Sequence, residues 1–115
     1  MIQIRHLHEK PASSDGERIY IDRLWADGAY TKFVKISVWN KDLAPSYDLW
    51  RFHYDPQNWD HFTRLYKEEL TKPGQQVALQ QLSEKAKEET LTLVYGNGDA
   101  AHNCAIVLKE MIEKK

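Results

Sequence analysis

The run Arg-Ile-Tyr-Ile-Asp-Arg-Leu-Trp, Arg18 to Trp25, constrains the fold more than any other stretch of the chain. Isoleucine alternates with other residues, β-branched and aromatic side chains are frequent, and turn-forming residues crowd positions 11–16, as expected before a buried strand. An acid and a base, Asp22 and Arg23, follow. Open α/β sheets bind ligands beyond the carboxyl ends of their strands. The run therefore predicts a strand with a candidate pocket at its end.

Strands and helices alternate along the rest of the chain. Apolar alternation and β-rich composition predict three further strands, near residues 2–7, 34–39 and 90–95. Helical spacing predicts four helices, near residues 47–53, 55–70, 77–86 and 99–112. The predicted N-terminal residues of three of these helices are Ser46, Asp55-Pro56 and Asp99. Because strands and helices interleave, the predicted class is α/β, a small parallel or mixed sheet of three to four strands with helices packed over it.

Length and composition restrict the protein classes. With 115 residues the chain can bury roughly two thirds of its unfolded surface, so we expect residues 1–115 to form one domain. Lysines and arginines (16) balance aspartates and glutamates (17) and are scattered, so a nucleic-acid partner is not expected. One cysteine, no secretory signal and no apolar run near the roughly 20 residues that span a bilayer predict a cytoplasmic protein without a membrane partner. The oligomeric state stays open.

Polar residues from two distant parts of the chain could face one crevice. Asp22 and Arg23 end the early strand, and His102 and Asn103 fall in the predicted first turn of the last helix. His102 would transfer a proton, Arg23 would hold an anion, and Asp22 or Asp99 would orient the base. In the structural alternative, Asp22 and Arg23 belong to an ion-pair network and His102 is solvated. The sequence does not decide between the two.

Other reactive side chains give weaker patterns. His6 and His8 share a face if the first strand extends that far, but no third ligand accompanies them. Cys104 is in helical register with Leu108 and Met111, which predicts a buried, inert thiol rather than a nucleophile. The chain carries no nucleophile elbow, P-loop or zinc-protease motif. We therefore predict no metal site and no cofactor.

Several segments in order resemble one family. They are residues 15–25, residues 39–46, Trp59 with Phe62, Tyr66 with Glu69 and Leu70, residues 92–95, Asp99, and His102 with Asn103. Together they are similar to the YeaO-like branch of the family called domain of unknown function 488, over nearly the whole chain. The resemblance implies a small, cytoplasmic, bacterial-type α/β protein of a family without an established reaction. Members of the wider family often carry a cysteine where Tyr95 stands, which disfavours thiol chemistry there.

The resemblance also implies a set of recurrent polar positions. They are Arg18, Asp22, Arg23, Lys41, Ser46, Tyr66, Glu69, Tyr95, Asp99, His102 and Asn103. Arg18 and Glu69 could equally be structural. From this set the predicted catalytic residues are His102, Asp22, Tyr95 and Asp99, and the predicted ligand-binding residues are Arg23, Lys41, Ser46 and Asn103.

The predicted function is binding of a small anionic or nucleotide-like ligand in a polar pocket at the carboxyl ends of the strands. The sequence leaves open whether a reaction follows. Two alternatives remain. One is a noncatalytic regulatory module that uses the same pocket, and the other is a protein or nucleic-acid interaction module that works through exposed aromatic side chains.

Overall fold

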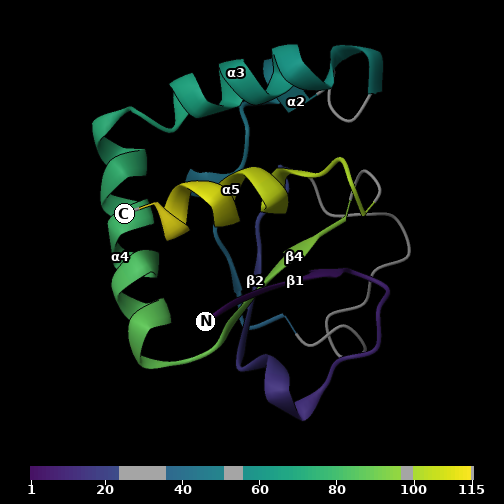
Figure 1. The fold of residues 1–115 in the computed structure, drawn as a ribbon, viewed down its shortest axis with the longest axis vertical. Coiled ribbons are helices and arrows are strands. Elements are labelled where there is room, and N and C mark those ends of the chain that lie inside the picture. The colour runs from purple at the N-terminus through teal and green to yellow at the C-terminus, as the bar shows by residue number, and fades with distance from the viewer. Residues whose placement is uncertain (24–35, 51–55, 97–99, 115) are drawn as a thin grey trace.

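The computed structural model describes residues 1–23, 36–50, 56–96 and 100–114 (Figure 1). Its strands are β1 (Ile2–His6), β2 (Glu17–Tyr20), β3 (Val38–Trp39) and β4 (Leu91–Tyr95). Its α-helices are α2 (Tyr47–Trp50), α3 (Trp59–Glu69), α4 (Pro73–Glu88) and α5 (Cys104–Glu113). Short 3-10 helices are η1 (Ser13–Asp15), η2 (Lys41–Leu43) and η3 (Pro56–Asn58). No helix among these residues is long and apolar enough to cross a membrane.

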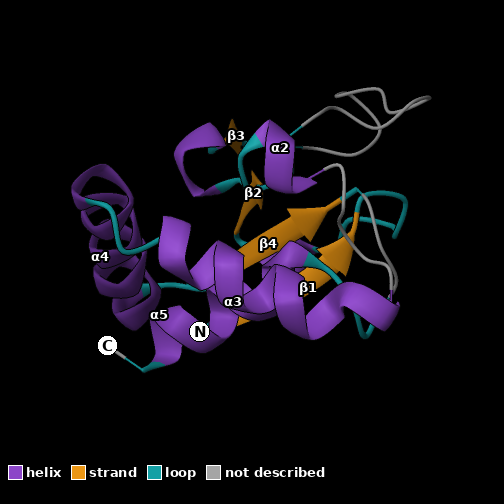
Figure 2. Ribbon diagram, turned by 90° about the horizontal axis from the view of Figure 1, so that it is seen from above, coloured by secondary structure: helices purple, strands orange, loops and turns teal. Residues whose placement is uncertain are grey.

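The four described strands form one sheet in the order β1-β4-β2-β3, and every pair is parallel. The α/β prediction is therefore confirmed. The last strand in the sequence lies inside the sheet, between β1 and β2. In Figure 1, α5 lies between α3 and the strands, and α4 runs down the left side. Figure 2 shows the arrowheads of β1 and β4 pointing the same way, so their carboxyl ends meet at one edge.

The sheet is buried on both faces, and the two faces differ. All five residues of β4 are buried. Leu91, Leu93 and Tyr95 belong to the large apolar core that the helices cover. Because side chains alternate along a strand, Thr92 and Val94 point to the opposite face. There Val94 joins a small apolar cluster with Leu7 and Tyr20, with Ile36 and Trp39 packed against it.

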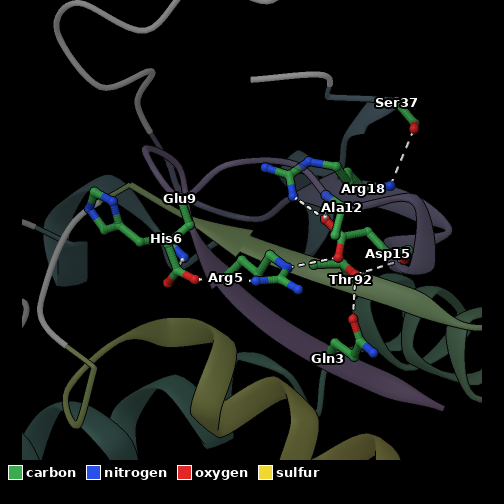
Figure 3. Close-up of polar contacts among 9 residues, drawn as sticks. All are labelled: Gln3, Arg5, His6, Glu9, Ala12, Asp15, Arg18, Ser37 and Thr92. Atoms are coloured by element: carbon green, nitrogen blue, oxygen red, sulfur yellow. Dashed lines mark hydrogen bonds and ion pairs between the residues drawn. The ribbon is translucent and has the colours of Figure 1, made fainter. Parts of the chain in front are cut away.

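A buried ionic cluster, Asp15 with Arg5 and Arg18, occupies the face of the sheet away from α5 (Figure 3). Arg5 Nε lies 2.7 Å from Asp15 Oδ1, and Arg18 Nη1 lies 2.6 Å from Oδ2. The Ala12 amide also donates to Oδ2, and Thr92 Oγ1 donates to the Asp15 carbonyl. Burial alone would raise the pKa of Asp15, but the hydrogen bond from the Ala12 amide, then those from Arg5 and Arg18, and the charge of Arg5 hold it below its ordinary value. The cluster fixes the loop before β2 to β1 and β4.

Gly16 makes the turn from η1 into β2. Its φ of 65° and ψ of −142° lie in a region that only glycine adopts readily. A Cβ built on Gly16 would lie 2.0 Å from the Thr90 carbonyl oxygen. The close approach of these two backbone segments therefore requires glycine at this position.

The helical stripe predicted between residues 55 and 70 is present, but α3 begins later than predicted. Pro56 opens the 3-10 turn η3, and the α-helix starts at Trp59. Asp55 lies outside the described residues. Phe62, Tyr66 and Leu70 are buried, so the predicted apolar face is the one that packs on the core. Proline stands at the first position of α4, where its missing N–H costs no helical hydrogen bond.

Two sequence predictions about the later helices are corrected. The last helix, predicted to start at Asp99, begins at Cys104 as α5, and its N-cap is Asn103, whereas Asp99 lies outside the described residues. The extended backbone of Asn103 lets its side chain accept from the Ile106 amide, which satisfies one of the donors at the helix start. His102 therefore precedes the helix instead of lying in its first turn. In α4, Val77 is 58% exposed, while Leu79 and Leu82 form the buried stripe.

Strand lengths also differ from the predictions. The strand β2 ends at Tyr20, so Asp22 and Arg23 lie beyond it, on the loop side of the sheet edge. In β3 only Val38 and Trp39 pair with β2, although the alternating pattern extends over residues 34–39. Residues 34 and 35 lie outside the described chain.

Candidate functional site

Asp22 connects the early and late parts of the chain at the carboxyl ends of the strands. Its side chain is fully buried, and Oδ2 accepts from the Gly96 amide at 2.6 Å. The Cys104 thiol donates to Oδ1 at 3.4 Å. Trp39 Nε1 donates to the Asp22 carbonyl at 2.8 Å. One residue therefore fastens β2 to the end of β4, the start of α5 and the edge strand β3.

The half-buried Arg23 side chain holds the neighbouring segment by its carbonyl oxygens. Nε donates to the Pro45 oxygen at 2.8 Å, and Nη2 donates to the Ala44 and Lys41 oxygens at 3.2 and 3.3 Å. These bonds satisfy carbonyl groups of η2 and the turn that follows it. The Arg23 guanidinium, which the sequence predicted to bind an anion, therefore donates hydrogen bonds to backbone carbonyls in the structure. The Lys41 ammonium lies 4.4 Å from the centre of the Trp39 ring, in a cation–π contact on the surface.

Ser46 begins α2 as predicted and joins it to α3. Its Oγ accepts from the Leu49 amide at 3.3 Å, which is the expected N-cap contact. The same hydroxyl donates to Glu69 Oε2, and the Ser46 amide donates to Oε1 at 2.9 Å. Nearby, the buried Tyr66 hydroxyl donates to the Leu43 carbonyl. Burial, with the nearby Cys104, Asp22 and Glu69, raises the pKa of the Tyr66 phenol well above its ordinary value, so it remains a donor.

The remaining predicted residues lie around the same edge of the sheet. The half-buried His102 ring meets the Trp59 ring edge-on, with centroids 5.2 Å apart. Tyr95 is buried, and its ring meets His6 in the same way at 5.1 Å. Asn103 is fully buried as the cap of α5. Asp99 lies outside the described residues. The predicted groups therefore come from segments that meet in space, and most of them contact protein atoms there.

Cys104 is buried, as predicted from its helical register. Sequence reasoning treated it as an apolar core residue and missed its contact with the Asp22 carboxylate. The available signal was its place directly after Asn103, a strong N-cap residue, which puts a thiol at the first turn of the helix. His6 Nδ1 accepts from the His8 amide at 3.1 Å. In the part of the chain that the structure describes, no three His, Cys, Asp or Glu residues are grouped as a metal site.

An open groove runs between α2 and α3, beside the network of Ser46 and Glu69. Its volume is about 680 Å³. The described residues that line it are Ser46, Asp48, Leu49, Asn58, His61, Phe62, Leu65, Glu68, Glu69 and Lys72. Ser46 belongs to the predicted site, whereas the groove itself was not predicted. The sequence carries no separate signal for the groove, because Leu65 has the helical spacing of the predicted buried stripe and only the fold shows that it is partly covered.

Comparison with known proteins gives the family of the chain. A protein of Escherichia coli K12, uncharacterised YeaO, is 31% identical over 112 residues, which cover 96% of each chain. Uncharacterised proteins of Mycobacterium tuberculosis and Mycobacterium bovis are 29% identical over 113 residues, 96% of this chain and 92% of theirs. No solved structure matches. The model of the inactive DUF488-N3 subclade matches residues 1–115, so the chain belongs to that subclade.

Proposed function

We propose that the chain is a noncatalytic binding module whose ligand occupies the groove between α2 and α3. One observation carries the proposal. Polar side chains at the strand ends hold the fold together, and an open groove of about 680 Å³ lies next to them. Its volume falls within the roughly 300–1,000 Å³ of small-molecule sites. The module would bind a ligand without transforming it.

The contacts of Arg23 and Asn103 support the noncatalytic version. Arg23 donates to three backbone carbonyls, and Asn103 accepts from the Ile106 amide. A ligand at either side chain would compete with these bonds, and each buried group left unsatisfied costs about 1–3 kcal/mol. The groove offers a binding surface that leaves the bonds intact. It is therefore the less costly place for a ligand.

The family supports the same version. The subclade to which the chain belongs is described as inactive. Tyr95, at the carboxyl end of β4, stands where the resemblance noted above places a cysteine in many members of the wider family. Tyrosine is a poorer nucleophile than cysteine at neutral pH, because its reference pKa of about 10 lies above the roughly 8.5 of a thiol. Both points favour binding over catalysis.

The test is a screen of a metabolite library by thermal shift, followed by NMR of the labelled protein with each hit. Leu65→Trp places a large side chain in the groove, and Val77→Trp makes the same kind of change on the exposed surface of α4. We expect Leu65→Trp to abolish binding, Val77→Trp to preserve it, and each ligand to be recovered unchanged. Chemical turnover of a bound ligand, or full binding by Leu65→Trp, would refute the proposal.

A small anionic or nucleotide-like ligand at the strand ends is a second candidate. It is favoured by the exposed ammonium of Lys41, which lies over the Trp39 ring next to the strand ends. Lys41 is exposed, so Lys41→Ala should leave the fold intact. The candidate predicts that inorganic phosphate or AMP stabilises the parent chain and that Lys41→Ala weakens the effect several-fold. The catalytic roles predicted for His102, Asp22, Tyr95 and Asp99 depend on this candidate, and unchanged phosphate and AMP after incubation would argue against them.

A further inference from the structure

We infer that the groove between α2 and α3 selects a small organic cation with an apolar body, such as an aromatic amine. This inference rests on the proposed function and names the chemical class of its ligand. It follows from the two kinds of side chain that line the groove. Apolar residues form its inner wall, and carboxylates dominate its charged residues.

The inner wall consists of Leu49, Phe62 and Leu65. Leu49 and Phe62 are buried in the main core, so they give a firm apolar surface rather than mobile side chains. Leu65 is partly buried and packs against the same core. An apolar ligand group on this wall would remove both surfaces from water, which is the main source of affinity in small-molecule sites. A ring or branched alkyl group fits this wall.

Carboxylates come to the groove from both of its helices. Asp48 lies on α2, and Glu68 and Glu69 lie on α3. Lys72 is the opposing cation among the described lining residues. Ser46 donates two hydrogen bonds to Glu69, but these neutral donors leave its negative charge uncancelled. The described ion pairs of the chain include none with Asp48, Glu68 or Lys72.

His61 also lines the groove. Its Nδ1 lies 3.0 Å from Arg64 Nη2. Arg64 itself is not among the described lining residues. The described lining is therefore net negative. It attracts an ammonium or guanidinium group and repels a carboxylate or phosphate.

Three probes with one ring system separate charge from shape. Tryptamine is a cation, tryptophol is neutral, and indole-3-propionate is an anion. Each is titrated into the full chain and followed by two-dimensional NMR at low salt. We expect tryptamine to shift the signals of the groove residues and to bind about 10-fold more tightly than indole-3-propionate, because the charge of each ligand interacts with the rim carboxylates of Asp48 and Glu68. Added salt should reduce the preference.

The double variant Asp48→Asn/Glu68→Gln removes the two rim charges. Its matched control, Glu84→Gln/Glu88→Gln, removes two exposed charges from α4, away from the groove. We expect the first variant to reduce the tryptamine preference to about 2-fold and the control to keep most of it. Equal loss in both variants would assign the preference to net charge alone and would overturn the inference.

Two further outcomes would overturn it. If indole-3-propionate binds as tightly as tryptamine, the groove has no preference for positive charge, although it could still be a noncatalytic binding site. Failure of all three probes to shift groove signals would exclude this ligand class. Neither outcome refutes the proposed function. That proposal is refuted by the library screen alone, through turnover of a bound ligand or full binding by Leu65→Trp.

Discussion

Two buried aspartates, one at each end of β2, have different kinds of partner. Asp15, before the strand, lies between the guanidinium groups of Arg5 and Arg18. Asp22, after the strand, accepts from the Gly96 amide and the Cys104 thiol. Both tie β2 to its neighbour β4, through Thr92 at one end and Gly96 at the other. Acids beside a buried strand can therefore serve the architecture, and charge alone does not mark a reactive site.

The largest expected effect comes from Asp15→Asn. The substitution keeps the shape of the side chain but leaves the buried Arg18 without its anion, which should destabilise the fold by about 3–5 kcal/mol. The measurement is urea unfolding followed by circular dichroism. Adding Arg18→Met should recover part of the loss, because no guanidinium is then buried without a counter-charge. A loss below 1 kcal/mol would show that the ionic cluster is dispensable.

Gly16→Ala tests the turn that carries Asp15 into β2. The positive φ and the clash with the Thr90 carbonyl predict a loss of about 3 kcal/mol. Gly74→Ala is the matched control, because an added Cβ meets nothing within 4 Å there. Its position in α4 predicts a neutral or slightly stabilising change. Thermal unfolding of the two variants measures the difference, and similar midpoints would disprove the requirement for glycine.

Asp22→Asn should have a smaller effect than the same change at Asp15. The new amide oxygen can still accept from Gly96, and the contact with the Cys104 thiol is a weak one, so we expect a loss of about 1 kcal/mol. The measurement is urea unfolding under the same conditions. A loss equal to that of Asp15→Asn would mean that Asp22 also compensates a buried cation.

Lowering the pH should change the free energy of unfolding only slightly near neutrality and should reduce it clearly in acid. The folded-state pKa of Asp15 lies below its unfolded value, so its contribution is complete above about pH 4 and is lost as the pH falls through the folded value. Unfolding free energies from pH 6 to pH 2 should therefore fall less steeply for Asp15→Asn than for the parent chain. If the two plots of unfolding free energy against pH are parallel, Asp15 does not contribute to the acid sensitivity of the fold.

Patterns with a strong period were predictable from the sequence. The alternation in β1 and the apolar run of β4 gave both strands within one or two residues. The stripe of Phe62, Tyr66 and Leu70 gave the buried face of α3. These features depend on the spacing of apolar residues that are close together in the sequence, so the local pattern is enough to predict them.

Features that depend on distant partners were not predictable. Asp99 and Asn103 are both good helix caps, and the position of the helix start was decided by packing. Asp15 was interpreted as part of a turn, although the buried Arg18 on β2 requires a nearby acid. The roles of Arg23 and Glu69 depend on carbonyls and hydroxyls of segments about 20 residues away. The candidate groove likewise exists only after α2 and α3 meet.

The strand order has a consequence for synthesis of the protein. In the described sheet, β1 and β2 have no shared edge, and each pairs with β4, which is made last. A nascent chain on the ribosome must therefore carry β1 and β2 without their shared partner until Tyr95 has left the exit tunnel. Sheet assembly is then a late event that closes long loops at once, which slows folding and prolongs exposure to aggregation and to chaperones.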